Sequence, residues 1–148
     1  MEQQLADSVC TDMSIPDGKV RLFVESDYAD LCAWWDGHNA LRVPLDRLPM
    51  GPGFGLIAPG LGAVFLYETG TPVAFIGNMV SNPRADKREV HAALDRLVYD
   101  LLWLARERGI SRVEGNTELM PVARRARNHG FLVKRGAYLS IEAYDQLG

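Results

Sequence analysis

Residues 73–109 read VAFIGNMVSNPRADKREVHAALDRLVYDLLWLARERG, and this stretch decides the fold. It begins with a β-rich run over residues 73–81, passes through Asn82-Pro83 and a charged loop, and continues into a long amphipathic helix. Apolar residues with helical spacing form one stripe on this helix, namely Val90, Leu94, Leu97, Val98, Leu101 and Ala105. We therefore expect a strand that leads to the N-terminus of a helix with one buried face.

Both ends of this helix are predicted by residues that commonly cap helices. Asp86 is a suitable N-cap, and Glu89 follows three residues later. Gly109 stands where a residue in the left-handed conformation ends a helix. A strand followed at once by a helix N-terminus is a common way to build a cleft.

The bulk composition indicates one soluble globular domain. The chain has 148 residues, of which 47% are hydrophobic and 24% charged, and a chain of this length buries about two thirds of its unfolded surface in one core. Residues 1–19 show no period, and we expect them to form a loose N-terminal arm. Residues 20–148 are expected to form a single domain.

The elements on either side of the central stretch follow from the same kind of reasoning. Upstream, we expect a strand at 20–24, a helix from Ser26 or Asp27 to about His38, and a surface loop from Pro44 to Gly55 that could fold over a cleft. Turn residues divide 54–81 into three strands of an antiparallel meander. Downstream, we expect a strand at 111–115, a helix at 119–128 with Pro121 in its first turn, and strands at 131–134 and 137–141. The predicted fold class is α/β of the α+β type, a mixed, mostly antiparallel sheet of six to seven strands flanked by three to four helices.

This order of elements resembles that of the GNAT (GCN5-related N-acetyltransferase) superfamily. The residues that carry the resemblance are Val80-Ser81-Asn82-Pro83, Ala105-Arg106-Glu107-Arg108-Gly109 and Asn128-His129-Gly130-Phe131. It extends from about Val20 to Tyr144, and within the superfamily the chain looks most like the compact GNAT-type proteins encoded by bacteriophages. It implies a GNAT-like acyltransferase domain that uses acetyl-CoA as co-substrate and acetylates an amine by direct attack in a ternary complex.

The resemblance also implies which residues bind the cofactor. In the family, the strand that matches 73–81 separates from its neighbour and offers main-chain groups to the pantetheine arm. The loop before the long helix holds the pyrophosphate at the positive end of the helix dipole, and an Asn follows the next strand at the edge of the cleft. The matching residues here are Met79, Val80, Ser81, Lys87, Arg88, Glu89, Val90, His91 and Asn116.

Two positions depart from the family pattern. The family places glycines in the pyrophosphate loop, whereas residues 89–94 of this chain contain none. Many members place a Tyr acid four or five residues before the closing Gly-Phe, where this chain has Arg125 and Ala126. These departures motivate an alternative hypothesis, a GNAT-like protein that no longer catalyses and serves as a binding or virion-associated phage protein.

Transfer of an acetyl group to an amine needs a base, an oxyanion donor and a proton source. The candidate bases are Glu114 and Glu68, and Tyr138 is a substitute acid; a solvated strand residue is the simpler explanation for each Glu, and β propensity explains the Tyr. The oxyanion donor implied by the family is a backbone N–H near Val80. His91 is a further candidate for phosphate contact or base.

Charge and composition limit which partners and which location we expect. The net charge is −3, but residues 1–50 carry four Lys/Arg against nine Asp/Glu and residues 101–148 carry eight against five. The arginines of 124–127 are expected to form a solvated helix face, with the adenosine 3′-phosphate or a partner as the alternative contact. We expect a small-molecule or protein amine as acceptor and a phage or host protein as a further candidate partner. Nucleic acid is a weaker hypothesis because the whole chain is acidic.

No membrane partner or metal is expected from the sequence. No apolar run approaches the roughly 18 residues of a membrane span, and the N-terminus lacks the basic segment of a signal peptide. Two cysteines are too few for a structural zinc site or a disulfide framework. A cytoplasmic location is therefore expected, which for a phage protein means the host cytoplasm or the virion.

Overall fold

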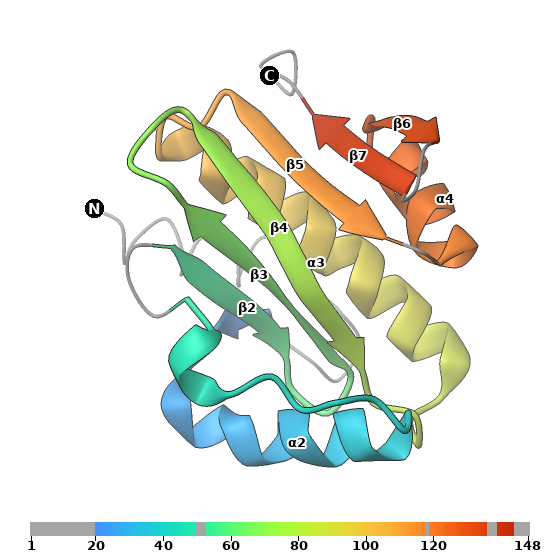
Figure 1. The fold of residues 1–148 in the computed structure, drawn as a ribbon. Coiled ribbons are helices and arrows are strands. Elements are labelled where there is room, and N and C mark those ends of the chain that lie inside the picture. The colour runs from blue at the N-terminus through green and yellow to red at the C-terminus, as the bar shows by residue number, and fades with distance from the viewer. Residues whose placement is uncertain (1–19, 50–52, 118, 136–138, 144–148) are drawn as a thin grey trace.

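A seven-stranded mixed sheet forms the centre of the protein (Figure 1). The computed structural model describes residues 20–49, 53–117, 119–135 and 139–143. The strands lie in the order β1 (Arg21–Leu22), β2 (Phe54–Ala58), β3 (Gly62–Glu68), β4 (Val73–Ser81), β5 (Arg112–Thr117), β7 (Leu139–Ala143) and β6 (Leu132–Arg135). Only β4 and β5 pair in parallel, and every other neighbouring pair is antiparallel. The predicted fold class is confirmed.

Three α-helices cover the sheet within the described part of the chain. The long helix α3 (Lys87–Glu107) and the short helix α4 (Met120–Asn128) lie behind the sheet in Figure 1, and α2 (Tyr28–Gly37) crosses its lower end near the end of β4. Two 3-10 turns, η1 (Glu25–Asp27) and η2 (Leu45–Arg47), complete the fold. Of the predicted Pro44–Gly55 loop, residues 50–52 lie outside the described part.

Strand alternation divides the core between the two faces of the sheet. Val64 and Leu66 of β3 point to the α3 side and pack with Leu97 and Leu101 in one cluster. Ala63 and Phe65, the intervening residues of the same strand, belong to a second cluster on the α2 side. That second cluster includes Trp34 and Trp35, each only 5% exposed, so these tryptophans are core residues.

The predicted caps of α3 are present. The carboxylate of Asp86 accepts hydrogen bonds from the backbone N–H groups of Arg88 and Glu89, both at 3.1 Å. Gly109 has φ +83° just after the helix, a conformation that L side chains rarely adopt. The sequence prediction for this helix is therefore confirmed at both ends.

The first strand is shorter than the predicted 20–24. Arg21 and Leu22 pair in register with β2, and the Phe23 N–H still donates to the Gly55 main-chain oxygen at 2.8 Å. The backbone N–H of Val24 donates instead to the Asp27 carboxylate at 2.9 Å, and the same carboxylate binds Arg21 at 2.7 Å. Asp27 thus ends the strand and begins the turn that leads into α2.

A β-bulge bends β4 near its middle. Between the pairs Phe65↔Gly77 and Ala63↔Val80, β3 contributes one residue and β4 contributes two. Asn78, one of these two, has the left-handed φ of 54°. The parallel register between β4 and β5 ends just before the bulge, at Phe75↔Glu114. Beyond this pair, residues 76–81 and 115–117 have no registered pairing with each other, and the sheet opens between its two central strands.

Candidate active site

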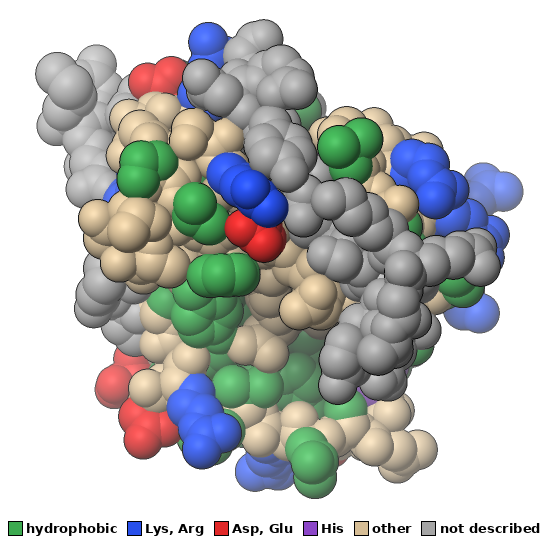
Figure 2. Space-filling model, turned by 45° about the horizontal axis from the view of Figure 1, so that its top comes forward, with side chains coloured by type: hydrophobic (Ala, Val, Ile, Leu, Met, Phe, Trp, Pro, Cys, Tyr) green, Lys and Arg blue, Asp and Glu red, His purple; other side chains and the backbone are tan. Residues whose placement is uncertain are grey.

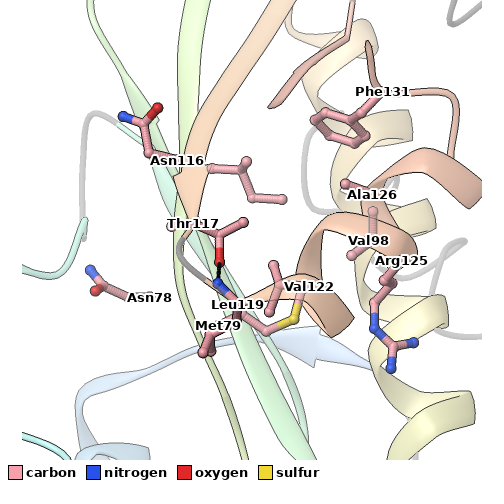
Figure 3. A pocket seen from close by; sticks show the side chains of 12 residues that line it. Asn78, Met79, Val98, Asn116, Thr117, Leu119, Val122, Arg125, Ala126 and Phe131 are labelled. Atoms are coloured by element: carbon pink, nitrogen blue, oxygen red, sulfur yellow. Dashed lines mark hydrogen bonds between the residues drawn. The ribbon is translucent and has the colours of Figure 1, made fainter. Parts of the chain in front are cut away.

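The opening between β4 and β5 holds a cavity of about 190 Å³ (Figure 3). Both strands, α3, α4 and the segment after β5 contribute to its walls. Its lining residues are Ile76, Gly77, Asn78, Met79, Val98, Asn116, Thr117, Leu119, Val122, Arg125, Ala126 and Phe131. We call this space the strand cavity. Its walls are largely apolar, so it suits an uncharged, extended group.

The two faces of the strand cavity differ in character. In Figure 3, Val98, Ala126 and Phe131 lie on the helix side, whereas the carboxamides of Asn78 and Asn116 point away from the helices. Thr117 accepts a hydrogen bond from the Leu119 N–H at 3.0 Å, which holds the chain where β5 leads into α4. The cavity therefore joins an apolar helix side to a polar opening on the other face of the sheet.

A row of side chains crosses the face of the sheet opposite α3. Tyr67, Phe75 and Glu114 are register partners on β3, β4 and β5. Phe75 is 45% exposed, and Glu114 forms an ion pair with Arg112 at 2.9 Å. Asn78 donates a hydrogen bond to the hydroxyl of Tyr67, whose pKa is raised by burial. Figure 2 shows hydrophobic side chains gathered in the hollow at the middle of this view.

A second cavity of about 300 Å³ lies at the junction of β4, α3 and α4. It is lined by His38, Ser81, Asn82, Pro83, Ala85, Lys87, Val90, His91 and Arg125. We call it the junction cavity. His38, the residue that follows α2, lies with its Nε2 2.9 Å from the main-chain oxygen of Ser81, which ties the end of this helix to the end of β4. Arg125 lines both cavities, so they adjoin at its side chain.

Arg125 is the centre of a polar network between α3 and α4. Its Nη1 donates to Asp95 Oδ1 at 2.7 Å and to the main-chain oxygen of His91 at 3.1 Å, and its Nη2 lies 2.9 Å from His91 Nδ1. His129 Nε2 donates to the same Asp95 oxygen at 3.1 Å. Burial alone would raise the pKa of Asp95, but the bonds from His129 and Arg125 outweigh burial and lower it.

The first turn of α3 does not form the amide cradle implied by the resemblance. Residues 89–94, which match the glycine loop of the family, are all helical, and the helix already begins at Lys87. The Asp86 carboxylate takes the N–H groups of Arg88 and Glu89, and the Val90 N–H bonds to the Asp86 main-chain oxygen at 2.9 Å. An anion at these amides would meet a carboxylate, so the residues present do not fit a pyrophosphate held by main chain.

The residues predicted to bind the cofactor divide among several places. Met79 and Asn116 line the strand cavity, and Ser81, Lys87, Val90 and His91 line the junction cavity. The side chain of Val80 is buried in the cluster on the α2 side. Arg88 and Glu89 line neither cavity.

The predicted catalytic residues are also separated. Glu114 lies at the last paired position before the sheet opens, on the face of the sheet opposite α3 that also carries Tyr67 and Phe75, which we call the open face. Glu68 pairs in register with Ala74, at the other end of β4, and binds Arg108 at 2.9 Å, so it lines neither cavity. Tyr138 lies outside the described residues.

From the sequence, the arginines of 124–127 were expected to form a solvated helix face, with the adenosine 3′-phosphate or a partner as the alternative contact, and within this group nothing distinguished Arg125. Its side chain is only 13% exposed. No single-residue signal marks it, since its partners lie 30 and 34 residues earlier in the chain. Ile76, Gly77 and Asn78 were likewise assigned only to a strand.

Neither a metal-binding cluster nor a membrane-spanning helix is present in the described part of the chain. Within residues 20–49, 53–117, 119–135 and 139–143, no group of three His, Cys, Asp or Glu side chains is arranged to hold a metal ion. No helix in those ranges has the length and apolar character needed to cross a bilayer.

The solved structures that this chain resembles include GNAT acetyltransferases. A GCN5-related N-acetyltransferase from Kribbella flavida superposes with a TM-score of 0.68 at 15% identity, covering 88% of this chain and 99% of that one. A ribosomal-protein-alanine N-acetyltransferase from Brucella melitensis gives 0.66 at 16%, covering 84% and 98%. A protein from Salmonella typhimurium, described as an acetyltransferase and solved with its cofactor acetyl-CoA, gives 0.66 at 13%, covering 86% and 94%.

No protein-family profile matches the chain, and no curated protein is similar to it in sequence. At these identities the likeness shows the fold alone. The protein therefore has the GNAT fold, and its activity has to be argued from the site.

Proposed function

We propose that this protein is an N-acyltransferase that takes an acetyl group from acetyl-CoA and transfers it to an amine. The observation that carries the proposal is the strand cavity, an apolar space between two central strands that have separated. A structure of similar fold was solved with acetyl-CoA as its cofactor, which supports the choice of donor.

The strand cavity suits the pantetheine arm of the donor. This arm is an extended chain that carries two amides, so it needs main-chain partners together with apolar walls. The edges of β4 over 76–81 and of β5 over 115–117 face each other without registered pairing, and Met79 and Phe131 supply apolar surface. The arm would bind there much as a strand adds to a sheet edge.

The proposed reaction is direct attack of the amine on the thioester carbonyl. The new N–C bond forms as the C–S bond breaks, and the proton lost by the amine is balanced by the proton gained by the thiolate. The N–H groups at the bulge beside Asn78 and Val80 are our candidates for stabilising the oxyanion. Glu114 is our candidate base, because it stands on the open face at the point where the strands separate.

The acceptor would enter from the open face. Phe75 offers an exposed ring, Asn78 and Asn116 offer carboxamides, and Glu114 offers a carboxylate beside Arg112. These groups suit a polar amine next to an apolar or aromatic surface. Attack from this face would leave the helix side to the donor, so that both substrates are bound together.

The alternative is a GNAT-shaped binding protein without catalysis, including a virion-associated one. The observation in its favour is the first turn of α3, where Asp86 takes the amides that would meet pyrophosphate. Isothermal calorimetry with acetyl-CoA separates the two hypotheses. The proposed function predicts saturable binding in the micromolar to low millimolar range, of the order usual for enzyme substrates, whereas absence of heat and of any thermal shift at millimolar acetyl-CoA would leave only the alternative.

A further inference from the structure

We propose that the junction cavity binds the phosphates of the donor through the side chains of Lys87 and Arg125, in place of main-chain amides. The identity of the ligand rests on the proposed function, whereas the position and chemistry of the site come from the geometry of α3 and α4. His91 would act as a positioning residue that holds Arg125.

The amides of α3 are unavailable because the protein supplies its own anion. The carboxylate of Asp86 lies 3.1 Å from the Arg88 and Glu89 nitrogens, and the Val90 N–H is bonded within the helix turn. A phosphate placed on them would have to displace the cap and overcome repulsion from its charge. Recognition by side chains requires neither change.

The junction cavity lies beside this blocked turn and contains cations from two helices. Lys87 is exposed and makes no ion pair within the described residues, so its ammonium group can turn toward a ligand. Arg125 reaches the same cavity from α4. The carboxylates near them are Asp86, which caps α3, and Asp95, which is shared by Arg125 and two histidines. A cavity of about 300 Å³ has room for a pyrophosphate group.

The hydrogen bonds of Arg125 leave part of its guanidinium available. The group carries five N–H donors and no acceptor. Three contacts are assigned, to Asp95 Oδ1, the His91 main-chain oxygen and His91 Nδ1. Two donors, on Nε and Nη2, therefore have no partner within the described residues. A guanidinium fixed on one side and open on the other suits an oxyanion.

The same contacts define the role of His91. Since Arg125 can only donate, His91 Nδ1 must accept, and the proton of a neutral ring then lies on Nε2. That nitrogen is 3.5 Å from Asp95 Oδ2. His91 therefore accepts through Nδ1 and orients Arg125, and the cations that line the site are Lys87 and Arg125.

The phosphate site would lie next to the strand cavity. Arg125 lines both spaces, so a ligand could extend from the junction cavity, past this guanidinium, into the opening between β4 and β5. The anionic phosphate end of the donor would lie in the junction cavity, and its uncharged arm would lie in the strand cavity. The arm would lie against Met79 and Ala126.

The test is titration calorimetry with coenzyme A on the wild type and three variants. Lys87→Gln and Arg88→Gln remove the same charge from adjacent residues, but only Lys87 lines the junction cavity. We expect Lys87→Gln to weaken binding by about fivefold to tenfold and Arg88→Gln by less than about twofold. Arg125→Gln is expected to weaken it by more than about tenfold, with Tm measured to exclude unfolding.

The salt dependence of the Kd for coenzyme A distinguishes a phosphate contact from a merely structural role, because losing a structural role would not change it. Loss of one phosphate contact should make the Kd of Lys87→Gln less sensitive to salt than the Kd of the wild type or Arg88→Gln. Two results would overturn this inference and leave the proposed function standing. One is an equal loss of coenzyme A affinity in Lys87→Gln and Arg88→Gln, and the other is an unchanged affinity in both Lys87→Gln and Arg125→Gln. Failure of the wild type to bind coenzyme A would overturn the proposed function itself.

Discussion

The buried carboxylate of Asp100 should make the stability of this protein fall as the pH rises above about 4. Asp100 lies on α3 with its side chain only 1% exposed, and its one ion-pair partner within the described residues is Arg96, at 2.9 Å. One of its oxygens has no hydrogen-bond partner in the part of the chain that the structure describes. Burial raises the pKa of this carboxyl from 3.8 to about 6, although Arg96 acts in the opposite direction.

The magnitude follows from this shift. A group whose pKa is raised on folding adds to the free energy of unfolding. This contribution is fully present below the pKa of the unfolded state and is lost as the pH rises through the pKa of the folded state. With values of 3.8 and about 6, the free energy of unfolding should fall by about 2 kcal/mol between about pH 4.5 and about pH 8. Asp27 and Asp95 have lowered pKa values, so their contributions are lost only at more acid pH.

Urea unfolding of Asp100→Asn beside the wild type isolates this contribution, because the amide has the same shape and no titration. The free-energy difference between the two proteins should shift by about 2 kcal/mol in favour of the variant from about pH 4.5 to about pH 8. Asp30→Asn, at an exposed position on α2, is the matched control and should show no such shift. Parallel curves for Asp100→Asn and the wild type would refute the reasoning.

Three further predictions concern the site and the sheet. Glu114→Gln should lower kcat/KM by about a hundredfold and remove the acid limb of the pH–rate profile; an unchanged profile would exclude Glu114 as the base. Val122→Trp should fill the strand cavity and weaken coenzyme A binding by at least about tenfold, whereas Arg124→Trp, on the exposed side of the same helix, should bind normally in the same titration. Gly55→Ala should cost about 1–3 kcal/mol in chemical unfolding, because its Cβ would overlap the buried ring of Phe65; a neutral result would show that the ring can move aside.

Local sequence was sufficient to predict most helices and strands. Asp86 and Gly109 bound α3 because capping depends on residues within one turn. Turn residues marked the three meander strands for the same reason. The first strand was predicted too long because its end depends on Asp27, whose side chain takes the Val24 amide.

The site depends on contacts that local sequence does not encode. The bulge at Asn78 arises from the pairing of β4 with β3, and the strand cavity arises because β5 continues along β7 after leaving β4. Arg125 becomes a site residue only when α4 lies beside α3. Glu68 was a plausible base until the register placed it at the opposite end of β4 from the opening.

The most direct test of the account is a crystal structure of the protein with coenzyme A. We expect the pantetheine arm between β4 and β5, beside Met79 and Asn116, with phosphate oxygens within hydrogen-bond distance of Arg125. Coenzyme A bound elsewhere, with the space between the two strands still empty, would contradict the assignment of this opening as the donor site.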